Sequence, residues 1–167
     1  QQLSSPKLIT KANALNKLVD KLARESIIAV DTESNSLYAY QEQVCLIQFS
    51  TQENDYLVDP LALNDIAALE PIFNSPQIEV IFHAAEYDLM CLKRDFGFTF
   101  THLFDTMVVA PTLGRKEVGL GSLLKAEFGV TVEKKYQRAN WGQRPLPERM
   151  LHYAQLDTHY LIALREI

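Results

Sequence analysis

The chain has 167 residues, of which 47% are hydrophobic and 22% charged, and its net charge is −5. A chain of this length can form one domain with a sizeable core, and its composition excludes a disordered or fibrous protein. No apolar run approaches the roughly 20 residues that a membrane-spanning helix needs, and the first residues lack a secretion signal.

The first predicted element is a helix over residues 11–24, where leucines follow helical spacing. Short apolar runs between turn signals predict four strands, over residues 26–31, 43–50, 55–59 and 79–83. Helical patterns predict further helices over residues 61–74, 85–95, 119–128 and 147–166, and a short helix that Asp105 opens. Three consecutive strands followed by alternating strands and helices indicate an α/β domain, with a mixed sheet flanked by helices.

Cys45 and Cys91 do not have the spacing of a metal site, so we expect a reducing, cytoplasmic environment. The chain does not begin with methionine, and it stops at Ile167 before any signal that ends the last predicted helix. We therefore expect residues 1–167 to form one domain, either excised from a longer protein or a compact member of its class.

The charges are unevenly distributed along the chain. Residues 1–124 hold 9 basic and 16 acidic side chains, whereas residues 125–149 hold 6 basic and 3 acidic ones. The net negative charge argues against a polyanionic partner. The local excess of cations therefore needs an explanation of its own.

Acidic side chains also occur where the predicted elements should be buried. Asp31 ends the strand predicted over residues 26–31, and Glu33 comes two residues later. A period of two residues points both side chains to the same side. An unpaired buried charge is costly, so a cation or a proton must offset these acids. A solvated turn would equally explain this pair taken alone.

Two predicted helices carry the other acids. Asp88 lies beside the apolar stripe of its helix, although an exposed acid near a helix start would explain it more simply. Asp157 lies inside the core-facing stripe of residues 147–166, one turn after Tyr153, with which it could share a buried hydrogen bond. Together the four acids supply the oxygen ligands that Mg²⁺ or Mn²⁺ prefers, and two such ions about 3.5–4 Å apart promote phosphodiester hydrolysis.

In order and spacing, three segments resemble the motifs of the DEDD exonuclease superfamily, in its tyrosine-containing branch: D-T-E at 31–33, H-x-x-x-x-D at 83–88 and Y-x-x-x-D at 153–157. Further segments are similar to ribonuclease D: CLIQFS (45–50), LFDTMVVAPTLG (103–114), GLGSLLKAEFGV (119–130) and residues 136–160. The resemblance spans nearly the whole chain. It implies a ribonuclease H-like fold and a metal-dependent exonuclease that removes nucleoside 5′-monophosphates from a 3′ end.

The resemblance also implies residue roles. Asp31, Glu33 and Asp157 would hold one metal ion, and Asp31 would bridge to a second, with Asp88 helping through water. Tyr153 would orient the attacking water, because a phenol with an ordinary pKa of about 10 is a poor base at neutral pH. All five residues are therefore predicted to be catalytic, and the four acids to bind metal.

Basic and aromatic residues alternate over 134–149, as in a channel for single-stranded nucleic acid. A solvated loop anchored by Trp141 would have the same composition. His83 could border the terminal nucleotide or be a packed core histidine, and the loop after the first motif could wedge against the terminal bases. The predicted substrate contacts are Thr32, Leu37, Tyr38, His83, Arg138, Trp141 and Arg144.

Three other residues receive structural roles. Asp105 in F-D-T is most simply a helix N-cap, and a place beside the metal ligands is the alternative. His152 and His159 lie off the face of Tyr153 and Asp157, so both are expected on the surface.

The leading hypothesis is a two-metal 3′–5′ exoribonuclease domain over residues 1–167 that acts on single-stranded or 3′-overhanging RNA, without a membrane or an obligate protein partner. The same chemistry on DNA is an alternative, since no residue clearly reads a 2′-hydroxyl. A catalytically silent nucleic-acid-binding module is the alternative from another class, although such a module would be expected to lose some site residues. We expect no C-terminal helical domain of the ribonuclease D kind after Ile167, and therefore weak, salt-dependent binding. Two divalent ions would cancel the four acidic charges, so the net charge does not exclude nucleic acid.

Overall fold

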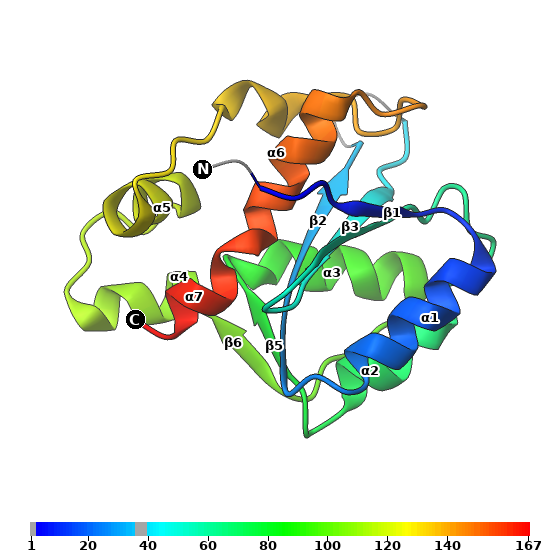
Figure 1. The fold of residues 1–167 in the computed structure, drawn as a ribbon, viewed down its shortest axis with the longest axis horizontal. Helices are drawn as coiled ribbons and strands as arrows, with labels where there is room; N and C mark the ends of the chain where they lie inside the picture. Colours follow the sequence, from blue (N-terminus) through cyan, green and yellow to red (C-terminus); the bar gives the residue numbers. More distant parts are fainter. Residues whose placement is uncertain (1–2, 36–39) are drawn as a thin grey trace.

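The computed structural model describes residues 3–35 and 40–167. Within them, six strands form one sheet in the order β1-β4-β3-β2-β5-β6 (Figure 1). Neighbours are antiparallel at β2/β3 and β3/β4, and parallel at β1/β4, β2/β5 and β5/β6. The strands are β1 (Lys7–Ile9), β2 (Ile27–Ser34), β3 (Val44–Ser50), β4 (Asp55–Val58), β5 (Glu79–Phe82) and β6 (Leu103–Asp105).

Helices cover both faces of this mixed sheet, with α6 crossing one face and α3 lying against the other (Figure 1). The α-helices are α1 (Ala12–Leu22), α2 (Glu70–Asn74), α3 (Ala85–Phe96), α4 (Thr106–Val109), α5 (Leu120–Phe128), α6 (Glu148–His159) and α7 (Leu161–Arg165). Short 3-10 helices are η1 (Ala67–Leu69), η2 (Ala110–Leu113) and η3 (Lys134–Arg138). The predicted α/β class with a mixed sheet is confirmed.

Strand β2 divides its side chains between the two faces. Ile28 and Val30 join the core beneath α1, α2 and α3, whereas Ala29 belongs to the core beneath α7. Because side chains alternate along a strand, Asp31 and Glu33 continue the row of Ala29. Both acids therefore face the layer formed by α6 and α7.

Strand β2 extends beyond its predicted end at residue 31, because β3 continues to pair with it. Asp31 lies opposite Gln48, and Glu33 lies opposite Leu46. The first motif is therefore part of a central strand, and the alternative of a solvated turn is wrong.

The helix predicted over residues 61–74 is much shorter in the structure, where α2 begins only at Glu70. Before it, the Asp59 carboxylate accepts hydrogen bonds from the backbone N–H groups of Leu61 and Ala62, and Asp65 accepts one from Ala67. These local bonds compete with a helix for the same donors.

The helix predicted over residues 147–166 is divided at Tyr160, between α6 and α7. The Tyr160 ring stacks on Phe128 of α5, and its neighbour His159 contacts Asp55 of β4. Two three-residue edge strands, β1 and β6, were missed because such short segments carry little periodicity. Among the described residues, no helix is long and apolar enough to cross a membrane.

Candidate active site

Three carboxylates converge between β2 and α6. Asp31 and Glu33 project from β2, and Asp157 projects from the last turn of α6, where it is 8% exposed. One oxygen from each of the three lies within 4.8 Å of the others. The period of β2 and the core-facing stripe of α6 thus bring acids more than 120 residues apart in sequence into one cluster.

Asp88 completes the cluster from the other side of β2. It lies in the first turn of α3 and is 8% exposed. Its carboxylate accepts a hydrogen bond from the Thr32 hydroxyl, and it is also hydrogen-bonded to Asp31. The four acids predicted to act together therefore lie together.

The electrostatics of the cluster call for a cation. Burial, and then the charges of neighbouring acids, raises the pKa of Asp31 and of Glu33 well above their usual values. Burial also raises the pKa of Asp88 and of Asp157 to about 6. A group of four carboxylates, of which Asp88 and Asp157 are buried and Asp31 and Glu33 half-buried, cannot stay fully charged on its own. Oxygen donors of this kind suit a hard divalent cation.

Tyr153 lies one turn before Asp157 on α6 and is 6% exposed. Burial, and then the charge of Asp157, raises the pKa of its hydroxyl. Its ring contacts Tyr136 and Trp141, with centroids 5.5 and 6.0 Å away, and its hydroxyl is hydrogen-bonded to the side chain of Gln137. A phenol that keeps its proton at neutral pH can orient a water but cannot act as a base.

Gln48 was missed by the sequence analysis. It is completely buried on β3, and its side-chain amide donates a hydrogen bond of 3.2 Å to Glu33 Oε1. A polar residue inside the apolar run CLIQFS was a signal that could have identified it. The amide fixes one of the carboxylate oxygens in the cluster.

A cavity of about 270 Å³ opens beside the acids. Its walls come from β2, α3 and the segment around η3, and they are lined by Thr32, Glu33, Ser34, Tyr87, Asp88, Gln137 and Ala139. The predicted substrate contact Thr32 lines this cavity, and its hydroxyl donates to Asp88.

The structure gives Arg144 a different role from the predicted substrate contact. Its guanidinium forms two hydrogen bonds with Asp59 and three with the backbone carbonyls of Cys45, Trp141 and Gln143. All five N–H donors are therefore used within the protein. The residue holds the segment before α6 against β3 and β4.

Trp141 likewise anchors this segment. It is 1% exposed, it packs against the core beneath α6, and its indole N–H donates to the Tyr136 carbonyl. A buried ring cannot stack on a nucleic-acid base, so the alternative of an anchored loop holds for Trp141.

The remaining predicted substrate contacts are Arg138, His83, Leu37 and Tyr38. Arg138 is exposed near the site, on η3. His83 Nδ1 is hydrogen-bonded to the Thr106 hydroxyl, which fits the packed-histidine alternative. Leu37 and Tyr38 lie outside the described residues.

Two of the three structural roles predicted for Asp105, His152 and His159 agree with the fold. Asp105 caps α4, as expected, by accepting from the Met107 N–H. His152 is exposed as expected, but His159 is partly buried because its ring nitrogen contacts Asp55 at 2.7 Å.

A mixed sheet whose central strand presents acids to a crossing helix defines the ribonuclease H-like class of nuclease fold. The model of a family described as 3′–5′ exonuclease matches residues 6–167. The chain therefore belongs to the 3′–5′ exonuclease family, and the resemblance to ribonuclease D is confirmed.

Individual relatives agree with this family. Protein RRP6-like 3 of Arabidopsis thaliana is 41% identical over 153 residues, which are 91% of this chain and 17% of that protein. The catalytic core of RRP6 from Trypanosoma brucei superposes with a TM-score of 0.94 at 35% identity, over 99% of this chain and 47% of that one. Escherichia coli RNase D, an exoribonuclease involved in structured RNA processing, has a TM-score of 0.91 at 34% identity, over 98% of this chain and 44% of that one. The chain thus spans less than half of each of these proteins.

Proposed function

We propose that this chain is a 3′–5′ exoribonuclease domain that uses two divalent ions, Mg²⁺ or Mn²⁺, to remove nucleoside 5′-monophosphates from RNA. The observation that carries the proposal is the convergence of Asp31, Glu33 and Asp157, with Asp88 and Tyr153 beside them. Similarity to an RNase D and to RRP6 supports RNA over DNA. Two buried, free cysteines support the cytoplasm as its location.

Each residue of the site would have a separate role in hydrolysis. Asp31, Glu33 and Asp157 would hold one ion and Asp31 would share the second, to which Asp88 contributes through water. The ions would lower the pKa of the attacking water and offset the charge of the phosphodiester. Tyr153 keeps its proton and orients that water by a hydrogen bond, while Gln137 holds the phenol in place.

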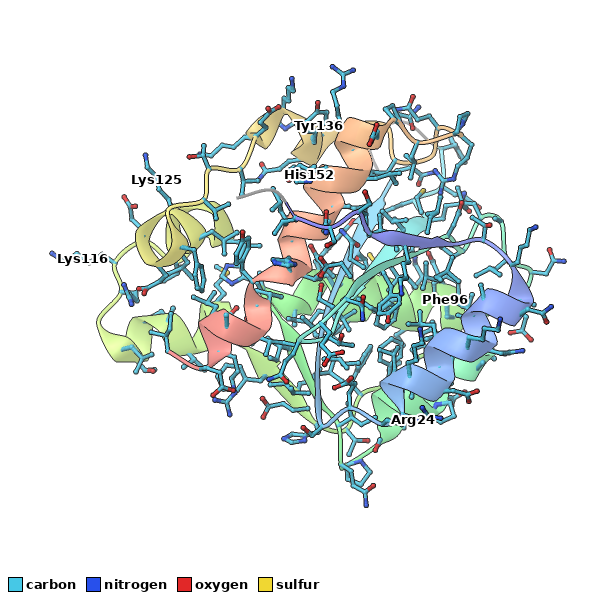
Figure 2. The ribbon with its side chains drawn as sticks, in the orientation of Figure 1. Arg24, Phe96, Lys116, Lys125, Tyr136 and His152 are labelled. Carbon is cyan, nitrogen blue, oxygen red and sulfur yellow. The ribbon has the colours of Figure 1, made fainter. Side chains whose placement is uncertain are left out.

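Single-stranded RNA would approach the site along the wall that Tyr153 shares with η3 and α6. A cavity of about 410 Å³ between η3 and α6 is shared by Tyr153 and the exposed Arg149 and His152, with Tyr136 on its wall. Figure 2 shows Tyr136 and His152 on the same side of the molecule, with Arg24 at the opposite end. Cations for phosphates and an aromatic ring for a base suit a single strand, with Arg138 exposed nearby on η3.

The test uses the purified chain alone with end-labelled RNA and DNA of equal sequence, in Mg²⁺, Mn²⁺ or EDTA. We expect RNA to shorten from its 3′ end to mononucleotides, without a partner protein, and the products to vanish in EDTA. If DNA is shortened faster than RNA, then DNA and not RNA is the preferred substrate. Cleavage of a 3′-blocked RNA at internal sites would contradict an exonuclease.

A pair of variants on α3 tests the chemistry. Asp88→Asn removes a carboxylate from the cluster, whereas Glu86→Gln changes an exposed acid two residues earlier on the same helix. We expect Asp88→Asn to lose activity by a factor of about 100 or more, as expected for an essential metal ligand, and Glu86→Gln to keep it. Binding of RNA without cleavage by the unmodified chain, in either metal, would indicate the silent binding module instead.

A further inference from the structure

The junction between β5 and α3 has an unusual backbone. Ala84 has φ 59° and ψ 59°, and it is the single non-glycine residue with positive φ in the described ranges 3–35 and 40–167. A residue with a Cβ adopts the left-handed region at a cost in free energy, so neighbouring interactions must hold it there. Asp88 lies only four residues beyond this junction.

The carboxylate of Asp105 provides these interactions. Its Oδ1 accepts hydrogen bonds of 2.9 Å from the N–H groups of Ala84 and Met107, and its Oδ2 accepts one of 2.7 Å from Ala85. One side chain therefore caps the first turns of both α3 and α4. The parallel pairing of β5 and β6, which aligns Phe82 with Asp105, places it there.

The adjacent residue secures the same junction. Thr106 is 5% exposed, and its hydroxyl donates to the Phe82 carbonyl and is hydrogen-bonded to His83 Nδ1. Two consecutive residues of the F-D-T segment therefore fix this junction. Thr106 bonds to the last residue of β5, and Asp105 bonds to the start of α3.

The position of Asp88 depends on how α3 begins. Each residue of an α-helix turns by about 100° and rises by 1.5 Å, so a change in the first turn moves the Asp88 carboxylate away from Thr32 and Asp31. We propose that Asp105 is a positioning residue of the metal site, which holds Ala84 in the left-handed conformation and thereby places Asp88 against Asp31. The inference rests on the proposed function.

The test is a double-mutant cycle with Asp105→Ala, Ala84→Gly and both together. We expect Asp105→Ala to lower kcat and to weaken Mn²⁺ binding, measured by calorimetry, by about tenfold each, with little change in KM for RNA. Glycine adopts positive φ readily, so adding Ala84→Gly should restore a substantial part of both losses. Recovery of both quantities is the result expected if Asp105 acts by holding Ala84 in this conformation.

Asp65→Ala is the matched control, because Asp65 also caps a backbone N–H, that of Ala67, outside the acid cluster. We expect it to change neither kcat nor Mn²⁺ binding. If Asp105→Ala does not fold, the variant Asp105→Asn is used in its place, since its amide oxygen can still accept from one partner group. We then expect a smaller loss in kcat and in Mn²⁺ affinity.

Equal behaviour of the Asp105 and Asp65 variants, or losses that Ala84→Gly does not reduce, would overturn the positioning role. If the unmodified chain lacks metal-dependent exonuclease activity, the proposed function fails. The Mn²⁺ calorimetry still decides the role of Asp105 in that case.

Discussion

At the scale of single residues, the acid cluster is a source of instability until a cation binds. Asp157 has a pKa raised to about 6 by burial, so its folded state binds a proton more tightly than the unfolded state does. Its contribution is therefore most favourable at low pH and is lost as the pH rises through about 6.

Asp157→Asn should accordingly stabilise the metal-free protein while abolishing exonuclease activity. In EDTA at pH 7.5 we expect a gain of about 1–3 kcal/mol in the free energy of unfolding, which shrinks towards pH 5. Thermal unfolding of both chains across this pH range measures it. A variant less stable than the parent chain at pH 7.5 would show that the acids do not repel one another.

Gln48 allows a second test at this scale. Its amide donates to Glu33, whereas its Oε1 is buried without a partner among the described residues. Replacing it with methionine, of similar volume, should weaken Mn²⁺ binding by about 10-fold or more because Glu33 loses its orientation. The comparison is Gln155→Met, which breaks a buried hydrogen bond to Asp55 and should reduce stability but not metal affinity. Equal Mn²⁺ affinities in the two variants would refute the role of Gln48.

At the scale of elements, helix α6 is held by polar contacts on the side away from the acids. Asp55 of β4 is 8% exposed and accepts hydrogen bonds from Ser50, Gln155 and His159. Burial by itself would raise the pKa of Asp55, but these hydrogen bonds outweigh it, and the pKa is lowered. Its stabilising effect is present above its unfolded pKa and is lost as the pH falls through its folded pKa.

Asp55→Ala should therefore destabilise the fold by about 3–5 kcal/mol at neutral pH, because the three partners lose their acceptor. Urea unfolding measures this loss. Asp20→Ala, at an exposed acid of α1, should change the free energy of unfolding by less than about 0.5 kcal/mol. A similarly small effect at Asp55 would show that these contacts do not anchor α6.

Element boundaries show where local patterns fail. Gly97 and Gly129, with φ of 71° and 68°, end α3 and α5 where the sequence predicts. The helix expected over residues 61–74 fails because two aspartates bond the backbone locally, and the one over 147–166 divides at Tyr160. A glycine ends a helix through its own backbone conformation, which the sequence shows directly. The break at Tyr160 cannot be seen in the sequence, because Tyr160 and His159 contact residues distant in sequence.

At the scale of the whole molecule, the distribution of charge matters more than the total of −5. Lys116 and Lys125 extend at the left of Figure 2, and Tyr136 and His152 lie at its top, all of them away from Arg24 at the lower right. We expect RNA binding by this chain to fall steeply as salt increases, because ions are released from the phosphates.

Arg149→Gln should weaken RNA binding and reduce the slope of log affinity against log salt concentration by about one. Arg24→Gln, at the far end of the molecule, is the control and should leave both quantities unchanged. Fluorescence anisotropy with a labelled single-stranded RNA at several salt concentrations measures them. Equal slopes for the two variants would show that the RNA does not pass Arg149.

The α/β class, most elements, and the four acids that the structure brings together beside Tyr153 could be predicted from the sequence. Periodicity and acids at core-facing positions are local properties of the chain, and the role predicted for Tyr153 came from the motif resemblance. Which side chains remain available to a substrate depends on contacts that form only in the folded chain. Arg144 and Trp141 are residue types that often bind nucleic acid. In the fold, however, Asp59 and three carbonyls accept all the N–H donors of Arg144, and the ring of Trp141 is buried in the core beneath α6. The hydrogen bonds of Asp105 to Ala84 and of Gln48 to Glu33 could not be predicted either. A hydrogen bond between distant segments depends on where the fold places both partners.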